Sequence, residues 1–338
     1  MEPINTTDLH TGGMPVRIVT SGYPEVKGDT ILAKRRYAKS DLDHLRTFLM
    51  HEPRGHYDQY GALLVKPDHP EADIGVLFMH NDGYSTMCGH ATIAVGRYVV
   101  DNKLNKQDVG VKNGKIATNI QCPCGLVRAS VDVKDGVSGA VTFISVPAFA
   151  CKLDFTVKTP SYGDIKCDIG YGGAFYAFVD VHQVNLDVSN SPCTELVKFA
   201  DEICEAVKKQ YAVKHPDDDD LSFLYGAILT DGKDSYSEEP TNNLCVFGDK
   251  EVDRSPCGSG STARLAIMYA KKCIQLQQER VTRNPKTGSQ FYCKVVEETK
   301  CGEFEAIRVQ VKGEAFYTGT SKFYAEPRDE LKHGFLIR

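Results

Sequence analysis

Short apolar runs separated by polar and glycine-rich turns occur throughout this chain of 338 residues. Segments such as 74–79, 127–133 and 141–146 are rich in β-branched residues and several alternate between apolar and polar positions, which predicts strands. Residues 40–50 and 194–209 instead predict helices, the first with Ser40 as its N-cap. The mixture predicts an α/β (α+β) fold.

Two segments recur later in the chain in the same order. Residues 8–19 align without gaps on residues 168–179, an offset of 160 (168 − 8), and the motif around Cys88 aligns on the motif around Cys257, an offset of 169 (257 − 88). The similar offsets indicate two copies of one fold. We therefore expect an N-terminal lobe over residues 1–150, a C-terminal lobe over residues 151–312, and a segment, 313–338, that returns to the N-terminal lobe.

Both copies carry a Cys-Gly pair between an apolar strand and a run of helix-forming residues. Cys88 and Cys257 should therefore lie at helix N-termini, where unpaired N–H groups and a partial positive charge favour a thiolate and can bind a carboxylate. A single Cys-Gly pair would more often be a buried structural thiol. The duplicated pair predicts two thiols on opposite faces of one small amino acid.

Composition excludes several other classes of partner. A net charge of −5 provides no cationic surface for nucleic acid or anionic lipid, and no apolar run is long enough to span a membrane. Residues 1–10 lack the apolar core of a secretory signal, so we expect a cytoplasmic protein. The acidic segment 215–220 predicts a solvated surface loop.

The twelve cysteines are expected to be mostly buried, reduced thiols, since the chain is large and carries no signal for export. Cys122 and Cys124 are spaced closely, but no second pair completes a zinc site, so we expect no metal. The sequence contains no phosphate-binding or dinucleotide-binding motif, and we expect no cofactor.

The motifs Met87-Cys-Gly-His90 and Asp253-Arg-Ser-Pro-Cys-Gly-Ser-Gly-Ser261 resemble the paired signatures of the proline racemase family. This family contains proline racemases, hydroxyproline 2-epimerases and trans-3-hydroxy-L-proline dehydratases. Outside the motifs, segments 81–90 and 224–233 are most similar to the animal dehydratases. Those dehydratases typically have Thr at the position of Cys257, whereas the racemases and epimerases have Cys.

The resemblance implies a fold like that of diaminopimelate epimerase: two pseudo-symmetric lobes, each wrapping strands around a central helix, with the active site in the cleft between them. It implies that Cys88 and Cys257 are the catalytic bases. It further implies that His90 and Asp253 contact the substrate amine and that the rings of Tyr60 and Phe247 hold the substrate ring. The substrate carboxylate is expected to bind to the backbone N–H groups of Gly89, His90, Gly258 and Ser259.

Because position 257 is Cys, we expect a cofactor-independent isomerase that inverts the α-carbon of proline or a hydroxyproline. The second hypothesis is trans-3-hydroxy-L-proline dehydratase, in which Cys88 alone removes the α-proton. A non-catalytic small-molecule binding protein and a thiol redox protein are two further hypotheses. The only expected partners are the small-molecule substrate and, in a homodimer, a second copy of the chain.

Overall fold

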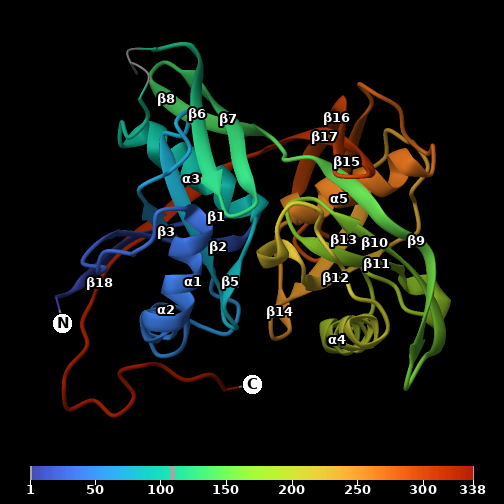
Figure 1. The fold of residues 1–338 in the computed structure, drawn as a ribbon, viewed down its shortest axis with the longest axis horizontal. Helices are drawn as coiled ribbons and strands as arrows, with labels where there is room; N and C mark the ends of the chain where they lie inside the picture. The colour runs from blue at the N-terminus through green and yellow to red at the C-terminus, as the bar shows by residue number, and fades with distance from the viewer. Residues whose placement is uncertain (1, 107–110, 338) are drawn as a thin grey trace. The chain divides into compact units, whose positions relative to one another are not determined.

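The computed structural model describes residues 2–106 and 111–337. The chain forms two compact units: unit 1 contains the residues up to 143 and those from 313 onward, and unit 2 contains residues 144–312. Figure 1 shows the strand-rich make-up of each unit and, within unit 1, both ends of the chain.

In its described residues, unit 1 combines three helices with a sheet of mixed direction. Its helices are α1 (Ile31–Asp41), α2 (Asp43–Met50) and α3 (Gly89–Asp101). Its strands are β1 (Ile4–Thr11), β2 (Met14–Ser21), β3 (Gly61–Val65), β4 (Ile74–Met79), β5 (Tyr84–Ser85), β6 (Gly114–Cys122), β7 (Gly125–Lys134), β8 (Val137–Ile144) and β18 (Ala315–Phe323).

Helix α3 is the central element of unit 1. It contacts six strands, β1, β2, β3, β6, β7 and β18, and eleven of its thirteen residues are buried. Its apolar residues occur on every side, with Ile93, Val95 and Val99 fully buried, so the helix presents no polar face to solvent. A helix of this composition is stable only when strands surround it. The packing of these strands against α3 fixes the position of its first turn.

Unit 2 contains two helices, α4 (Cys193–Gln210) and α5 (Gly258–Ala270). Its strands are β9 (Ala148–Thr159), β10 (Gly163–Tyr171), β11 (Phe175–Asp180), β12 (Leu224–Thr230), β13 (Thr241–Phe247), β14 (Glu251–Val252), β15 (Glu279–Arg283), β16 (Gln290–Cys301) and β17 (Phe304–Gly313). Two short 3-10 helices, η1 (Val181–Val184) and η2 (Asp219–Leu221), lie in its loops.

The strands of unit 2 pair in a closed ring. The order is β9, β10, β11, β12, β13, β15, β16 and β17, and β17 pairs again with β9. Helix α5 contacts β9, β10, β11 and β16 of this ring. The central helix of unit 2 is therefore surrounded in the same manner as α3.

The pairing order also matches between the units. In unit 1 the six pairs from β18–β1 to β6–β7 are parallel or antiparallel in a fixed order along the sheet. The parallel pairs are β2–β3 and β4–β6, and the antiparallel pairs are β18–β1, β1–β2, β3–β4 and β6–β7. The six pairs from β9–β10 to β15–β16 have the same sequence of directions. Asp8 and Asp168, the first residues of the duplicated segment, lie on the corresponding strands β1 and β10. This agreement is what an internal duplication predicts.

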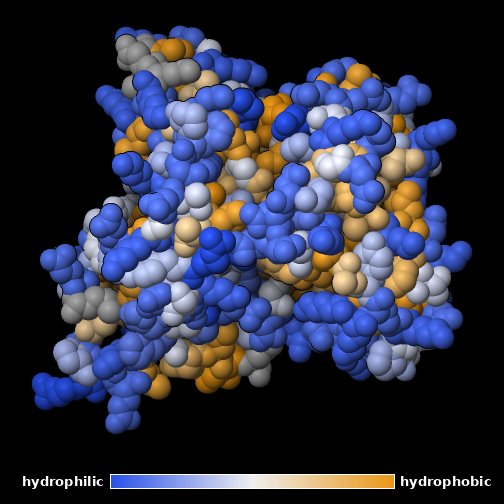
Figure 2. Space-filling model, in the orientation of Figure 1, coloured by the Kyte–Doolittle hydropathy of each residue, from blue (hydrophilic) through white to orange (hydrophobic). Residues whose placement is uncertain are grey.

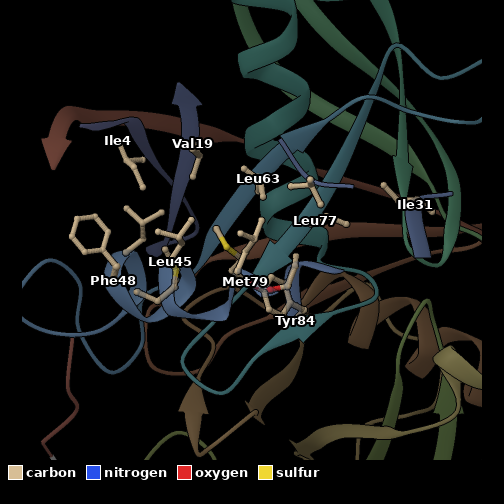
Figure 3. Packing of buried hydrophobic residues seen from close by; sticks show 14 residues of the cluster. Ile4, Val19, Ile31, Leu45, Phe48, Leu63, Leu77, Met79 and Tyr84 are labelled. Atoms are coloured by element: carbon tan, nitrogen blue, oxygen red, sulfur yellow. Dashed lines mark hydrogen bonds between the residues drawn. The ribbon is translucent and has the colours of Figure 1, made fainter. Parts of the chain in front are cut away.

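Helices α1 and α2 cover one side of the unit 1 sheet through a cluster of apolar side chains. Figure 3 shows Leu45 and Phe48 of α2 beside Ile4 and Val19, with side chains of β3 and β4 next to them. Ser40 does not cap a helix as predicted, because α1 begins earlier, at the cap Thr30, whose side chain accepts a hydrogen bond from the Ala33 N–H. The prediction of one helix over residues 40–50 identified α2 and missed α1, which precedes it.

Hydrophilic residues cover most of the visible face of each unit in Figure 2. Among the described residues, no helix is both long and apolar enough to cross a membrane. All twelve cysteines are free thiols, and most are buried, including Cys88 and Cys257.

Candidate functional site

Cys88 occupies the N-cap position of α3, at the end of a short connection from strand β5. Its backbone is extended (φ −144°, ψ 111°), and its carbonyl accepts the first helical hydrogen bond, from the Thr92 N–H at 2.9 Å. The N–H groups of the first turn, which begins at Gly89, have no acceptor within the helix. The thiol is only 6% exposed, so these N–H groups and the sulfur share a desolvated position.

His90 lies directly beside this sulfur. Its Nδ1 is 3.1 Å from Cys88 Sγ, and its backbone carbonyl accepts a hydrogen bond from Thr11 Oγ1 at 2.9 Å. Burial lowers the pKa of His90 to about 3, opposed by a hydrogen bond to the Pro15 backbone. The imidazole is therefore neutral near pH 7, and stabilisation of a Cys88 thiolate depends on the N–H groups and dipole of α3 rather than on an imidazolium.

Tyr60 precedes strand β3 and is also part of this group. Its ring meets the His90 ring edge-on at 4.8 Å between centroids, and its hydroxyl is 2.6 Å from Ser85 Oγ. The side chain is almost fully buried. In unit 1 the predicted residues Cys88, Gly89, His90 and Tyr60 thus lie together.

Cys257 occupies the N-cap position of α5 in unit 2. Its φ of 64° lies in the left-handed region, which a residue with a side chain adopts only where its surroundings enforce it. A Cβ on Gly260 would lie 2.9 Å from Cys257 Sγ, so the glycine leaves room for the thiol. The backbone conformation of Cys257 and the small size of Gly260 together set the position of the sulfur. Backbone strain of this kind is often found at functional sites.

Two hydroxyl groups surround the Cys257 sulfur. The Cys257 thiol donates toward the Tyr176 hydroxyl at 3.7 Å, and Ser259 Oγ lies 3.9 Å from the sulfur. Tyr176 and Ser259 are joined to each other at 2.8 Å. Burial raises the pKa of Tyr176 well above its usual range, so its hydroxyl keeps its proton.

Asp253 lies in the turn before Cys257 and is 2% exposed. Its Oδ1 accepts a hydrogen bond from the Ser255 N–H at 2.7 Å, and its carboxyl also bonds to the Cys257 side chain. Burial raises the pKa of Asp253 to about 7 despite these bonds. The carboxyl therefore exchanges its proton near neutral pH, as acids and bases at functional sites often do.

The remaining predicted residues also lie in unit 2. Gly258 and Ser259 form the first turn of α5, and Phe247 ends strand β13, where its ring stacks on Tyr225 at 5.2 Å. The structure therefore brings Asp253, Cys257, Gly258 and Ser259 together at the N-terminus of α5.

Three residues of this group were missed in the sequence: Tyr176, Ser255 and Cys245. Cys245 hydrogen-bonds with the Cys257 side chain, although its apolar strand predicted only a core thiol. Tyr176 lies in the second copy of the duplicated segment, so that alignment was the available signal. Ser255 lies within the Cys257 motif itself, and its hydroxyl accepts from the Cys257 N–H.

The model of the family described as "Proline racemase" matches residues 6–336. The chain belongs to the proline racemase family. It is 56% identical to the trans-L-3-hydroxyproline dehydratase of Xenopus tropicalis over 99% of this chain and 95% of that protein. It is 52% identical to the trans-3-hydroxy-L-proline dehydratase of Homo sapiens, with the same coverage.

The fold of the family is also evident in solved structures. A hydroxyproline epimerase from Agrobacterium vitis, with bound trans-4-hydroxy-L-proline, superimposes with a TM-score of 0.92 and 26% identity, covering 100% of this chain and 95% of that one. The predicted mixed α/β fold is therefore correct.

The predicted racemase or epimerase function is wrong. Relatives that share more than half of the residues along the whole chain are dehydratases, whereas the epimerase structure shares about a quarter. The prediction gave Cys257 more weight than the rest of the chain. Removal of an α-proton begins both inversion and elimination, so a pair of cysteines does not distinguish the two reactions.

Proposed function

We propose that this protein is a hydro-lyase that dehydrates trans-3-hydroxy-L-proline. The observation that carries the proposal is the 56% and 52% identity to two dehydratases named for this reaction, each over 99% of the chain. The cysteine at the N-terminus of α3 supplies a chemically suitable base for its first step.

In this proposal the Cys88 thiolate removes the α-proton of the substrate. The negative charge that develops spreads into the substrate carboxylate, which the N–H groups of a helix first turn bind more strongly as its charge grows. The neutral ring of His90, 3.1 Å from the sulfur, fixes the position of the thiol. Its low pKa prevents it from taking the proton in place of Cys88.

The electron pair left on the α-carbon then forms a double bond to C3, and the C3–O bond breaks. The departing oxygen takes a proton and leaves as water, so the products are one water and a ring with a 2,3 double bond. We assign this proton to the thiol of Cys257, whose side chain bonds to the buried carboxyl of Asp253.

The family resemblance also assigns Asp253 to the amine of the substrate. The substrate ammonium is then the partner of Asp253. A cation beside this carboxyl lowers its pKa. Binding of the cationic substrate and ionisation of Asp253 are therefore coupled.

The test is to incubate the purified protein with trans-3-hydroxy-L-proline and to follow the loss of one water by mass spectrometry. The Cys88→Ser variant should lose this activity, and Cys193→Ser, which changes an exposed cysteine, should retain it. Release of an epimer or a D-amino acid without loss of water would contradict the proposal. So would equal rates of water loss in the wild type and Cys88→Ser.

A further inference from the structure

A second group of ligating side chains lies in unit 2, on elements that hold none of the site residues described above. His215 and Asp217 belong to the loop between α4 and β12, and Cys301 ends strand β16. Ligand atoms of the three residues all lie within 4.8 Å of one another. From the sequence we expected a solvated loop here. We also expected no metal, because no second pair of ligating residues accompanies Cys122 and Cys124.

We propose that His215, Asp217 and Cys301 bind a zinc ion. Cys301 Sγ is 3.8 Å from His215 Nε2 and 3.8 Å from Asp217 Oδ2. Tetrahedral zinc, with bonds of about 2.3 Å to sulfur and about 2.0–2.2 Å to nitrogen or oxygen, separates such ligand atoms by about 3.6 Å. The two distances from Cys301 Sγ exceed that separation by about 0.2 Å.

The donor set favours zinc over other common cations. A thiolate and an imidazole are poor ligands for magnesium and calcium, which prefer oxygen. One thiolate, one carboxylate and one neutral imidazole balance the two positive charges of zinc. The run of aspartates that begins at Asp217 adds a negative potential at the open side, where Asp217 is exposed and water can provide a fourth ligand.

The surroundings hold two of the three ligands in place. The His215 ring packs against the Tyr171 ring at 4.6 Å between centroids, and both His215 and Cys301 are buried. Gly302 brings the hairpin after β16 against the loop: a Cβ there would lie 2.4 Å from the Cβ of Pro216. Asp217 is the exposed member of the three, so its side chain is the one that solvent leaves room to move.

Binding changes the hydrogen bonds of His215. In the structure Nδ1 accepts from the Asp217 N–H at 3.2 Å, which leaves the ring proton on Nε2, facing Cys301. A zinc ion on Nε2 shifts that proton to Nδ1 and breaks this long hydrogen bond. The Asp217 N–H is then released to water, which is possible because Asp217 is exposed.

Cobalt(II) is the probe for this site, since it replaces zinc in tetrahedral sites and its bond to a thiolate absorbs light in the near ultraviolet. The protein is treated with a chelator and then titrated with Co²⁺. The Cys88→Ser/Cys257→Ser background removes the two thiols of the proposed active site as competing ligands. We expect one Co²⁺ per chain, with a sulfur-to-cobalt band that added Zn²⁺ abolishes.

Asp217→Asn should weaken Co²⁺ binding at least tenfold, since even the loss of a group that only supports a ligand costs about 10–100-fold. Asp219→Asn, which makes the same change at an exposed residue two positions away, should bind as the parent does. Cys301→Ser should lose the sulfur band, and circular dichroism checks its fold. Equal affinities in the two Asn variants, or no sulfur band in the parent, would overturn the proposal.

Discussion

The buried carboxyl of Asp253 leads to a quantitative prediction about stability. Its pKa in the folded protein is about 7, raised from 3.8 by burial. Between these two values the unfolded chain has released the proton and the folded chain still holds it. Stability is therefore lost as pH rises from about 4 to about 7, and the loss levels off above that.

Between pH 5 and pH 8 the linkage relation gives a loss of about 2–3 kcal/mol from this one group. Asp253→Asn removes the titration, and its amide oxygen can still accept from the Ser255 N–H. We expect the stability of Asp253→Asn relative to the wild type to rise by about 2–3 kcal/mol over this range. For a unit of this size that corresponds to about 5–10 °C in melting temperature.

The assay is differential scanning calorimetry of both proteins at pH 5, 6, 7 and 8, following the transition of unit 2. Asp219→Asn controls for the change in net charge, because it neutralises an exposed aspartate in the same unit. A relative stability that changes by less than about 0.5 kcal/mol between pH 5 and pH 8 would refute the reasoning. It would mean that the Asp253 carboxyl titrates alike in the folded and unfolded chains.

Three further predictions concern the two cysteine helices. Cys88→Ser should lower the rate of water loss by about 10²–10⁴-fold, the usual contribution of a proton-transfer group. Stopped-flow measurements with saturating substrate give this rate, and a smaller decrease would contradict the role of Cys88 as the base. Tyr176→Phe removes one hydroxyl beside Cys257, so kcat should fall up to about tenfold, the equivalent of one hydrogen bond, while KM changes little; an unchanged kcat would exclude a role in positioning Cys257. Gly172→Ala places a Cβ 2.2 Å from the Ser259 carbonyl, so urea unfolding should show a loss of about 1–3 kcal/mol; wild-type stability would show that the turn shifts at no cost.

The sequence predicted the helix N-termini more accurately than their surroundings. A Cys-Gly pair between an apolar strand and a helix-forming run is a local pattern, and Cys88 and Cys257 are N-cap residues as predicted. Tyr176 and Cys245 reach Cys257 from strands β11 and β13, through contacts between residues far apart in the chain. Such contacts leave no periodic pattern. The identity of the reaction was likewise not predictable from one cysteine, because two reactions share the same first proton transfer.

The last strand of unit 1 has a consequence for synthesis on the ribosome. Strand β18 pairs with β1, and so unit 1 is completed only by residues from 313 onward, whereas every strand of the unit 2 ring ends by Gly313. Unit 2 is thus an insertion within unit 1 and can fold while the ribosome still holds the final segment. Until β18 emerges, β1 exposes an unpaired edge to other nascent chains. Truncation before residue 315 should consequently give a soluble unit 2 joined to an aggregation-prone unit 1.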